Sequence, residues 1–369
     1  APPPRRTLPP LALGHLWRLT DSTGVLQHAI YDIPDADHGY CTDDNARALA
    51  LMVAIEDLGL ETPETIRATA TYATFLGHAF EPTTGRFRNL LGFDRRWSDD
   101  AGTDDCLGRA VLALGACLGQ SRRPGLRRWA MRFFPAAVVA LEACTSPRAW
   151  ATGLIGIVHP LDRLGGDRRM AAAAAGLARR LLDLHRATAT PDWPWLEDSL
   201  TYDNARICQA LVASGRALGD PAVLDLGLRL LEWLARLQIT TTGRFGPIGC
   251  HGFMRRGAPP AAFDQQPLEA HGMVAACLEA ARATGDESWT EIAWSAFDWF
   301  HGHNVLGLAL CDPRTGGCRD GLLEDRTNDN QGAESTLAAL AALVEMQHVA
   351  PAAADGRARP RRSACREGV

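Results

Sequence analysis

Five short segments of the sequence place acidic side chains at the start of an apolar stretch that is rich in alanine and glycine. Segments 42–49 (TDDNARAL) and 103–110 (TDDCLGRA) carry adjacent aspartates, and the others lie at 202–207, 266–272 and 330–335. A helix N-terminus stabilises carboxylates, and crowding raises the pKa of some of them, which gives the contrast that a general acid and a general base require. We therefore predict a catalytic set of Asp44 and Asp105 with their neighbours Asp43 and Asp104, supported by Asp203, Glu269 and Glu334.

A structural explanation competes with this one, because a single acid before a helix is commonly an N-cap. The adjacent pairs are harder to explain in that way, since one cap uses one side chain and a second carboxylate only adds repulsion. Arg47, Arg109 and Arg206 each follow an acid by about one helical turn. We expect these arginines to pair with the acids rather than to contact a substrate.

Aromatic side chains accompany the acids, many of them in the predicted loops. Flat rings stack on the C–H faces of sugars, while carboxylates, amides and arginines bind hydroxyl groups. The sequence therefore predicts a carbohydrate site, with substrate contacts from Tyr40, Trp97, Trp195, Tyr202, Asp203, His251, Gln266, Glu269 and Glu334.

Several kinds of chemistry are not expected. The 38 basic residues counted as Lys plus Arg are all arginines, which excludes a Schiff-base lysine, a pyridoxal phosphate anchor and a P-loop. No HExxH motif or other ligand spacing indicates a metal, so we predict neither metal nor cofactor. The ten cysteines form no CxxC motif, which favours reduced thiols in a cytoplasmic protein.

The acidic segments recur at intervals that fit two helices and a loop each. Taking a weaker copy at 150–158 as the sixth, the repeats begin near 44, 105, 150, 203, 268 and 332. Amphipathic stretches richer in arginine lie between them, at 64–80, 125–143, 167–186, 221–237 and 287–301, and a twelfth helix can come from 11–19. The turn motifs at 83–87, 241–245 and 312–317 indicate short hairpins. We predict an all-α (α/α)6 barrel, with six inner helices, six outer helices and the acids around one mouth.

The ends of the chain differ in composition from the repeats. We predict a proline-rich lead-in or linker at 1–10, one catalytic domain at 11–348 and a disordered tail rich in alanine, proline and arginine at 349–369. The net charge of −5, without a basic stripe inside the repeats, argues against nucleic acid as a partner. No apolar run is long enough to predict a membrane span.

At the TDDNARAL (42–49) and TDDCLGRAVLAL (103–114) segments the sequence resembles the six-hairpin, (α/α)6-toroid carbohydrate-active enzymes. That superfamily includes inverting and retaining glycosidases, unsaturated glucuronyl hydrolases and N-acylglucosamine 2-epimerases. The adjacent aspartates are similar to the catalytic pair of bacterial α-1,6-mannanases, although Asn45-Ala46-Arg47 replaces the aromatic stretch usual there. The stretch at 38–49 (HGYCTDDNARAL) also resembles a domain found beside or fused to bacterial glycosyltransferases, which implies such a partner.

The leading hypothesis is a glycoside hydrolase that acts on a bacterial oligo- or polysaccharide through carboxylate acid/base catalysis, with or without a carboxylate nucleophile. A sugar epimerase or isomerase of the same fold is the alternative, in which His38, His251 and His271 would transfer protons. A phosphorylase, and a non-catalytic glycan-binding toroid attached to a glycosyltransferase, stay open as well.

Overall fold

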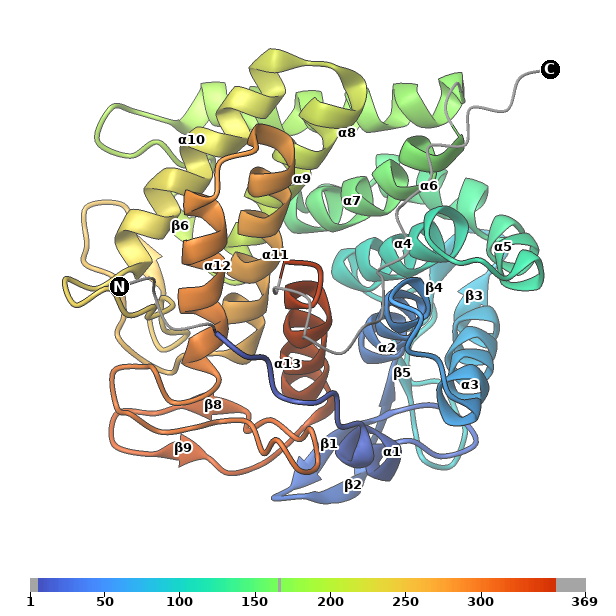
Figure 1. Ribbon diagram of the computed structural model, residues 1–369. Helices are drawn as coiled ribbons and strands as arrows, with labels where there is room; N and C mark the ends of the chain where they lie inside the picture. Colours follow the sequence, from blue (N-terminus) through green and yellow to red (C-terminus); the bar gives the residue numbers. More distant parts are fainter. Residues whose placement is uncertain (1–5, 165–166, 350–369) are drawn as a thin grey trace.

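The computed structural model describes residues 6–164 and 167–349, and over these residues the predicted helical toroid is confirmed (Figure 1). Each inner helix packs against the next, and the last packs against the first, so the inner helices form a closed ring. They are α2 (Thr42–Asp57), α4 (Asp104–Gly119), α7 (Pro147–Leu164), α9 (Asn204–Leu218), α11 (Pro267–Thr284) and α13 (Ala333–Met346). All six repeats of the sequence, including the weaker one near residue 150, therefore correspond to inner helices.

The outer helices follow the amphipathic stretches, with one exception. They are α1 (Gly14–Leu19), α3 (Pro63–Ala79), α5 (Pro124–Met131), α6 (Phe134–Glu142), α8 (Arg168–Thr188), α10 (Pro221–Gln238) and α12 (Ser288–Trp299). The prediction of a single helix at 125–143 is wrong, because the chain breaks between α5 and α6. Pro135 lies in the first turn of α6, where it lacks the N–H that a continuous helix would need to bond the carbonyl of Met131.

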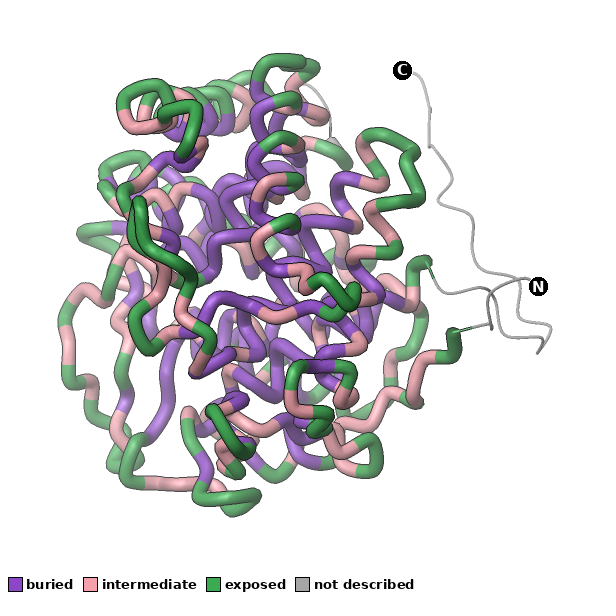
Figure 2. The backbone as a smooth tube through the Cα atoms, turned by 90° about the vertical axis from the view of Figure 1, so that its left-hand side faces the viewer, coloured by how far each residue is buried: buried purple, intermediate pink, exposed green. Residues whose placement is uncertain are grey.

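Small residues let the inner helices approach one another closely. A Cβ placed on Gly115 of α4 would lie 1.9 Å from the carbonyl oxygen of Gly156 on α7, and one on Gly108 would lie 3.0 Å from the backbone of Ala149. The inner ring is accordingly the most buried part of the backbone, and exposed residues collect on the outer helices and loops (Figure 2). The alanine- and glycine-rich composition of the repeats is thus a packing requirement of the ring.

The outer helix α10 shows how an amphipathic stretch is held in place. The side chain of Asp220 accepts hydrogen bonds from the backbone N–H groups of Ala222 and Val223, and Pro221 occupies the first helical position. Leu231 and Leu234 are completely buried against the inner helices, whereas Arg236 is exposed. Burial of one face only is the pattern that the apolar spacing predicted.

Short strands connect many of the helices at the end of the toroid where the inner helices begin. The predicted hairpin at 83–87 is formed by β3 (Phe80–Glu81) and β4 (Arg86–Phe87), while single bridges, Ile239 to Phe245 and Cys311 to Cys318, close the other two predicted turns. Five further short strands are β5 (Leu90–Leu91), β6 (Ser199–Leu200), β7 (Met254–Arg255), β8 (Gly321–Leu322) and β9 (Thr327–Asn328).

The sequence analysis did not predict the longest hairpin, which β1 (Leu26–Ile30) and β2 (Ile33–Cys41) form immediately before α2. It pairs His28 with Asp35 and Leu26 with Tyr40, and the register shifts between these two pairs. In Figure 1 this hairpin lies at the same end of the molecule as β8 and β9.

None of the helices in the described part of the chain is long and apolar enough to cross a membrane.

Candidate functional site

The first turn of α2 carries a buried aspartate that shares an arginine with the first turn of α13. Arg47 Nη1 donates to Asp44 Oδ1 at 2.6 Å, and Arg47 Nη2 donates to Glu334 Oε2 at 2.5 Å. The Asp44 side chain is only 4% exposed, whereas 44% of the Glu334 side chain reaches solvent. Burial raises the pKa of Asp44 to about 7, and the nearby Glu334 and Asp43 add to this while Arg47 opposes it. Asp44 can therefore exchange a proton near neutral pH.

The adjacent aspartates Asp104 and Asp105 have different surroundings. Asp105 accepts a hydrogen bond from the hydroxyl of Tyr202, whereas Asp104 pairs with Arg86 at 3.0 Å on the outer side of α4. Thr103, and not either aspartate, caps α4 through the N–H of Cys106. The capping explanation for this pair is therefore wrong, and Asp104 has the role of an ion-pair partner in the structure.

Asp43 lies close enough to Asp105 and Glu334 for their charges to affect it. Burial raises the pKa of Asp43, and the charges of Asp105 and Glu334 contribute in the same direction, against Arg47 and Arg109. Its Oδ1 atom is buried without a hydrogen-bond partner among the described residues. We call Asp43, Asp44, Asp105 and Glu334 the mouth acids, since they lie together at the N-terminal ends of α2, α4 and α13.

Asp203 and Glu269 form a second buried group at the start of α9. Asp203 is 2% exposed, has a left-handed backbone (φ 51°) and pairs with Arg109 at 3.2 Å. Glu269, which is 6% exposed, accepts a hydrogen bond from the backbone N–H of Asp203. Burial raises the pKa of Glu269 to about 8, with the charge of Asp203 as the next cause. Glu269 therefore fixes the backbone at the N-terminus of α9.

The arginines pair with acids, as expected, but not always with the nearest one in sequence. Arg47 pairs with Asp44, and Arg206 Nε lies 3.7 Å from Asp203 Oδ1. Arg109 of α4 reaches past α7 to Asp203 at the start of α9, and not to Asp105. An interhelical ion pair of this kind depends on the order of the inner helices around the ring, which local spacing does not encode.

Two histidines of the β1–β2 hairpin lie side by side, and His28 is on β1, the strand that packs against α13. The rings of His28 and His38 are 4.7 Å apart and nearly perpendicular, and His38 Nε2 is 3.5 Å from Asp35 Oδ2. Burial and then the neighbouring His38 lower the pKa of His28, while Asp35 and Glu334 act in the opposite direction. The sequence analysis named His38 but missed His28, which the strand alternation before α2 could have revealed.

Three of the predicted substrate aromatics lie elsewhere than at the mouth. Tyr40 and Trp195 are completely buried; Tyr40 donates to Asp21, and Trp195 stacks on Trp233 of α10. Trp97 packs edge-on against Phe75 of the outer helix α3. Tyr40 and Trp195 therefore present no free face to a sugar, whereas Trp97 is half-buried and stays a predicted substrate contact. Tyr202, which is 39% exposed and bound to Asp105, is the aromatic residue that does lie at the mouth.

The other polar residues predicted to bind substrate lie on the loop before α11. His251 is exposed, and Gln266 donates from Nε2 to Asp264 Oδ2 at 2.8 Å. Burial raises the pKa of Asp320 to about 6, with smaller contributions from Glu334 and Asp264, and Asp320 accepts a hydrogen bond from the N–H of Gly332 before α13. Asp320 was not among the predicted residues, although it connects this loop with the mouth acids.

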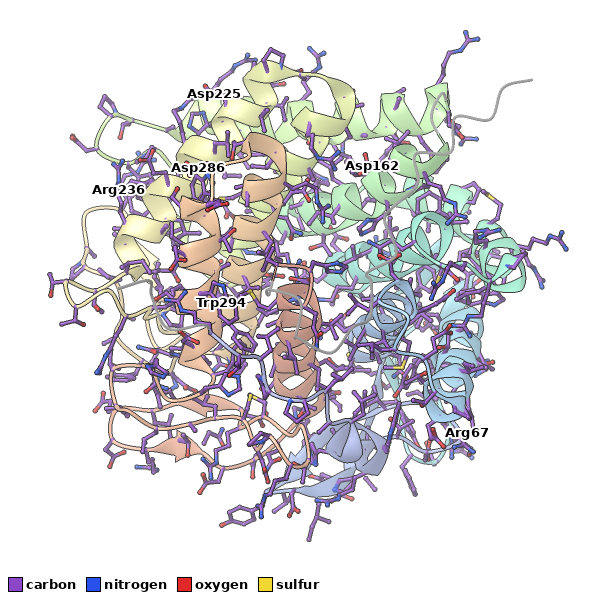
Figure 3. All side chains as sticks on the ribbon, in the orientation of Figure 1. Arg67, Asp162, Asp225, Arg236, Asp286 and Trp294 are labelled. Atoms are coloured by element: carbon purple, nitrogen blue, oxygen red, sulfur yellow. The ribbon has the colours of Figure 1, made fainter. Side chains whose placement is uncertain are left out.

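A cavity of about 520 Å³ occupies the centre of the ring and is lined by all six inner helices. Arg47, Arg109 and Arg206 line one end of it, and its lining continues to Asp162 on α7 and Asp286 before α12, both labelled in Figure 3. Among the described residues that line the cavity, the mouth acids are absent. Arg47, which pairs with Asp44 and Glu334, therefore connects the mouth acids with the wall of the central cavity.

His271 of α11 faces this cavity and not the mouth. Its Nε2 is 3.2 Å from Glu345 Oε1, and its ring contacts Arg206 Nη2. Burial lowers the pKa of His271, and Arg206 lowers it further, against the opposing effect of Glu345. His38, His251 and His271, which the epimerase alternative joined in one site, thus lie in three different places.

No family model and no curated protein sequence matches this chain. Solved structures do match, among them a sugar epimerase from a ruminal bacterium (12% identity, TM-score 0.69), with 90% of this chain and 95% of that one covered. A cellobiose 2-epimerase from Bacillus thermoamylovorans is 11% identical with a TM-score of 0.69, covering 91% and 96% of the two chains. A GH76 alpha-mannanase from Bacteroides thetaiotaomicron is 9% identical with a TM-score of 0.62, covering 90% and 93%.

These similarities establish the fold, which is the (α/α)6 toroid of carbohydrate-active enzymes, over about nine tenths of the chain. The similar structures include epimerases, which rearrange sugars, and a mannanase, which hydrolyses glycosidic bonds. The reaction class, the site residues and the glycosyltransferase partner stay predictions.

Proposed function

We propose that this protein is a carbohydrate-active enzyme that epimerises or isomerises a sugar by proton transfer next to its carbonyl group. The observation that carries the proposal is the pair of imidazoles, His28 and His38, the first of which lies near the mouth acid Glu334. The epimerases among the similar solved structures support it, since their TM-scores of 0.69 exceed the 0.62 of the mannanase. The sequence analysis put the glycoside hydrolase first and the epimerase or isomerase second, and this proposal reverses that order.

The reaction needs a base that removes the proton from the carbon beside the carbonyl and an acid that returns a proton to that carbon or its neighbour. Imidazole is suited to both roles near neutral pH, and so is a carboxyl group whose pKa is about 7, such as Asp44. The negative charge that develops on the sugar oxygen needs a cation nearby. Arg47, held between Asp44 and Glu334, is an arginine at this end of the ring that could supply the charge.

The test is proton exchange, followed by NMR in heavy water with glucose, mannose, cellobiose and mannobiose as substrates. An epimerase incorporates deuterium at the carbon beside the carbonyl and forms the second sugar. His28→Gln and His38→Gln should each lower the rate by about 10²–10⁴. His303→Gln, on the exposed chain after α12, is the matched control and should leave the rate unchanged. Wild-type rates in both hairpin variants would refute the assignment.

Glycoside hydrolysis is the second candidate, and it is favoured by Asp43 and Asp105, two carboxylates of neighbouring inner helices, of which Asp105 raises the pKa of Asp43. One would protonate the leaving oxygen while the other activates water or attacks the anomeric carbon. Release of reducing sugar from a polysaccharide panel tests this reaction. Asp105→Asn should then lower the rate by about 10²–10⁴, and Asp104→Asn, on the outer side of α4, should lower it far less. Activity that survives Asp105→Asn would exclude this mechanism.

A further inference from the structure

The loop between α10 and α11 brings together three side chains that are suited to bind a metal ion. The ligand atoms of Cys250, His251 and Asp264 all lie within 4.8 Å of one another. Two backbone hydrogen bonds hold the segments side by side, from Cys250 N to Asp264 O at 2.9 Å and from His251 N to Phe263 O at 3.1 Å. The three ligands are therefore close because the backbone is paired.

The carboxylate of this cluster lacks a partner that it needs. Asp264 is only 8% exposed, and although its Oδ2 accepts a hydrogen bond from Gln266, its Oδ1 is buried with no hydrogen-bond partner among the described residues. Gly321 leaves room for this oxygen, since a Cβ at that position would lie 2.4 Å from it. A buried carboxylate oxygen without a partner is costly, and a bound cation would remove that cost.

We propose that Cys250, His251 and Asp264 bind a divalent transition metal, with Zn²⁺ as the ion that best suits them. Thiolate, imidazole and carboxylate are the ligands that zinc takes in proteins, and three of them leave the fourth tetrahedral position free. Because His251 is exposed, that position is open to water or to a hydroxyl group of a ligand. Binding displaces the thiol proton of Cys250, which passes to solvent.

The metal would lie beside the mouth acids rather than in the central cavity. Asp264 Oδ1 lies against Gly321, and the preceding residue, Asp320, accepts a hydrogen bond from the backbone N–H of Gly332 at 2.8 Å, directly before α13. The sequence analysis predicted no metal because the ligands fall on two loop segments, separated by 12 intervening residues that match no known metal-binding spacing.

Cobalt is the probe for this site, because Co²⁺ bound by a thiolate in tetrahedral geometry shows a sulfur-to-metal charge-transfer band and intense visible bands. The full chain, first freed of metal by dialysis against a chelator, should gain these bands on titration with Co²⁺ and lose them when Zn²⁺ is added. Cys250→Ser should abolish the charge-transfer band. His251→Gln, at an exposed position, should weaken Co²⁺ binding by more than about 100-fold, beyond the loss that outer-shell changes cause.

Cys311→Ser is the matched control, since Cys311 is also a half-buried free thiol but lies between α12 and α13, outside the cluster. It should leave the cobalt spectrum unchanged, and far-UV circular dichroism should be the same for all variants. A titration without a thiolate band, or a band that persists in Cys250→Ser, would overturn the proposal. The readout does not involve sugar turnover, so its result tests the metal site independently of the proposed reaction.

Discussion

Replacing Glu269 by glutamine should remove a pH dependence that this single buried carboxyl group imposes on the stability of the fold. Its pKa is about 8 in the folded protein, against an ordinary value of 4.5, because of burial and then the charge of Asp203. Between these two values the folded state holds one proton more than the unfolded state, so the free energy of unfolding falls by about 1.4 kcal/mol for each pH unit. From pH 4.5 to about pH 8 the loss amounts to about 5 kcal/mol.

Glutamine imitates the protonated carboxyl group, and its side-chain oxygen can still accept the hydrogen bond from the N–H of Asp203. Urea unfolding of the wild type and of Glu269→Gln, from about pH 5 to about pH 8, measures the difference between the two free energies. The variant should match the wild type at the acid end and become more stable than it by several kcal/mol at the alkaline end. Glu232→Gln, at an exposed position on α10, should run parallel to the wild type. Parallel curves for Glu269→Gln as well would refute the reasoning.

Three further predictions concern packing and capping, and urea unfolding measures each of them. Leu234→Ala should destabilise the protein by about 2–5 kcal/mol, because Leu234 is fully buried in α10, and a loss of a few tenths would contradict that burial. Gly115→Ala should cost about 3 kcal/mol or more, since its Cβ would meet Gly156 at 1.9 Å, while Gly176→Ala on α8, with open space around it, should stabilise by about 0.5–1 kcal/mol. Asp220→Ala should cost about 1 kcal/mol through loss of the α10 cap, and an unchanged midpoint would show that water replaces the cap without loss.

The sequence predicted the ring of inner helices because the information for it is local and repeated. Each inner helix needs small residues wherever it approaches its neighbour, as Gly115 and Gly156 do, and this need leaves a periodic trace in composition. The outer helices leave a similar trace in their one-sided apolar spacing, and α10 begins at the predicted cap. The break between α5 and α6 was missed although Pro135 marks it. The β1–β2 hairpin was missed because a hairpin with one exposed face resembles a polar loop in sequence.

The site depended on tertiary structure to a much greater extent. The recurrence of acids at helix starts correctly predicted where Asp43, Asp44, Asp105 and Glu334 gather, since N-terminal ends of neighbouring inner helices meet at one rim. It could not distinguish Asp105 from Asp104, because adjacent residues on a helix point about 100° apart and only the neighbouring elements decide which of them faces Tyr202.

Contacts between distant segments carried no trace in the sequence at all. The pairing of Arg109 with Asp203, and the approach of Cys250 and His251 to Asp264, arise from the order of the helices and from the path of one loop. Whether an aromatic ring is free to stack on a sugar is decided in the same way. Trp195 and Tyr202 are both aromatic residues that the sequence predicted to contact substrate. Packing against Trp233 buries Trp195, whereas Tyr202 stays exposed at the mouth. Residue type thus limits what chemistry a side chain can perform, and its tertiary surroundings determine whether it is in a position to perform it.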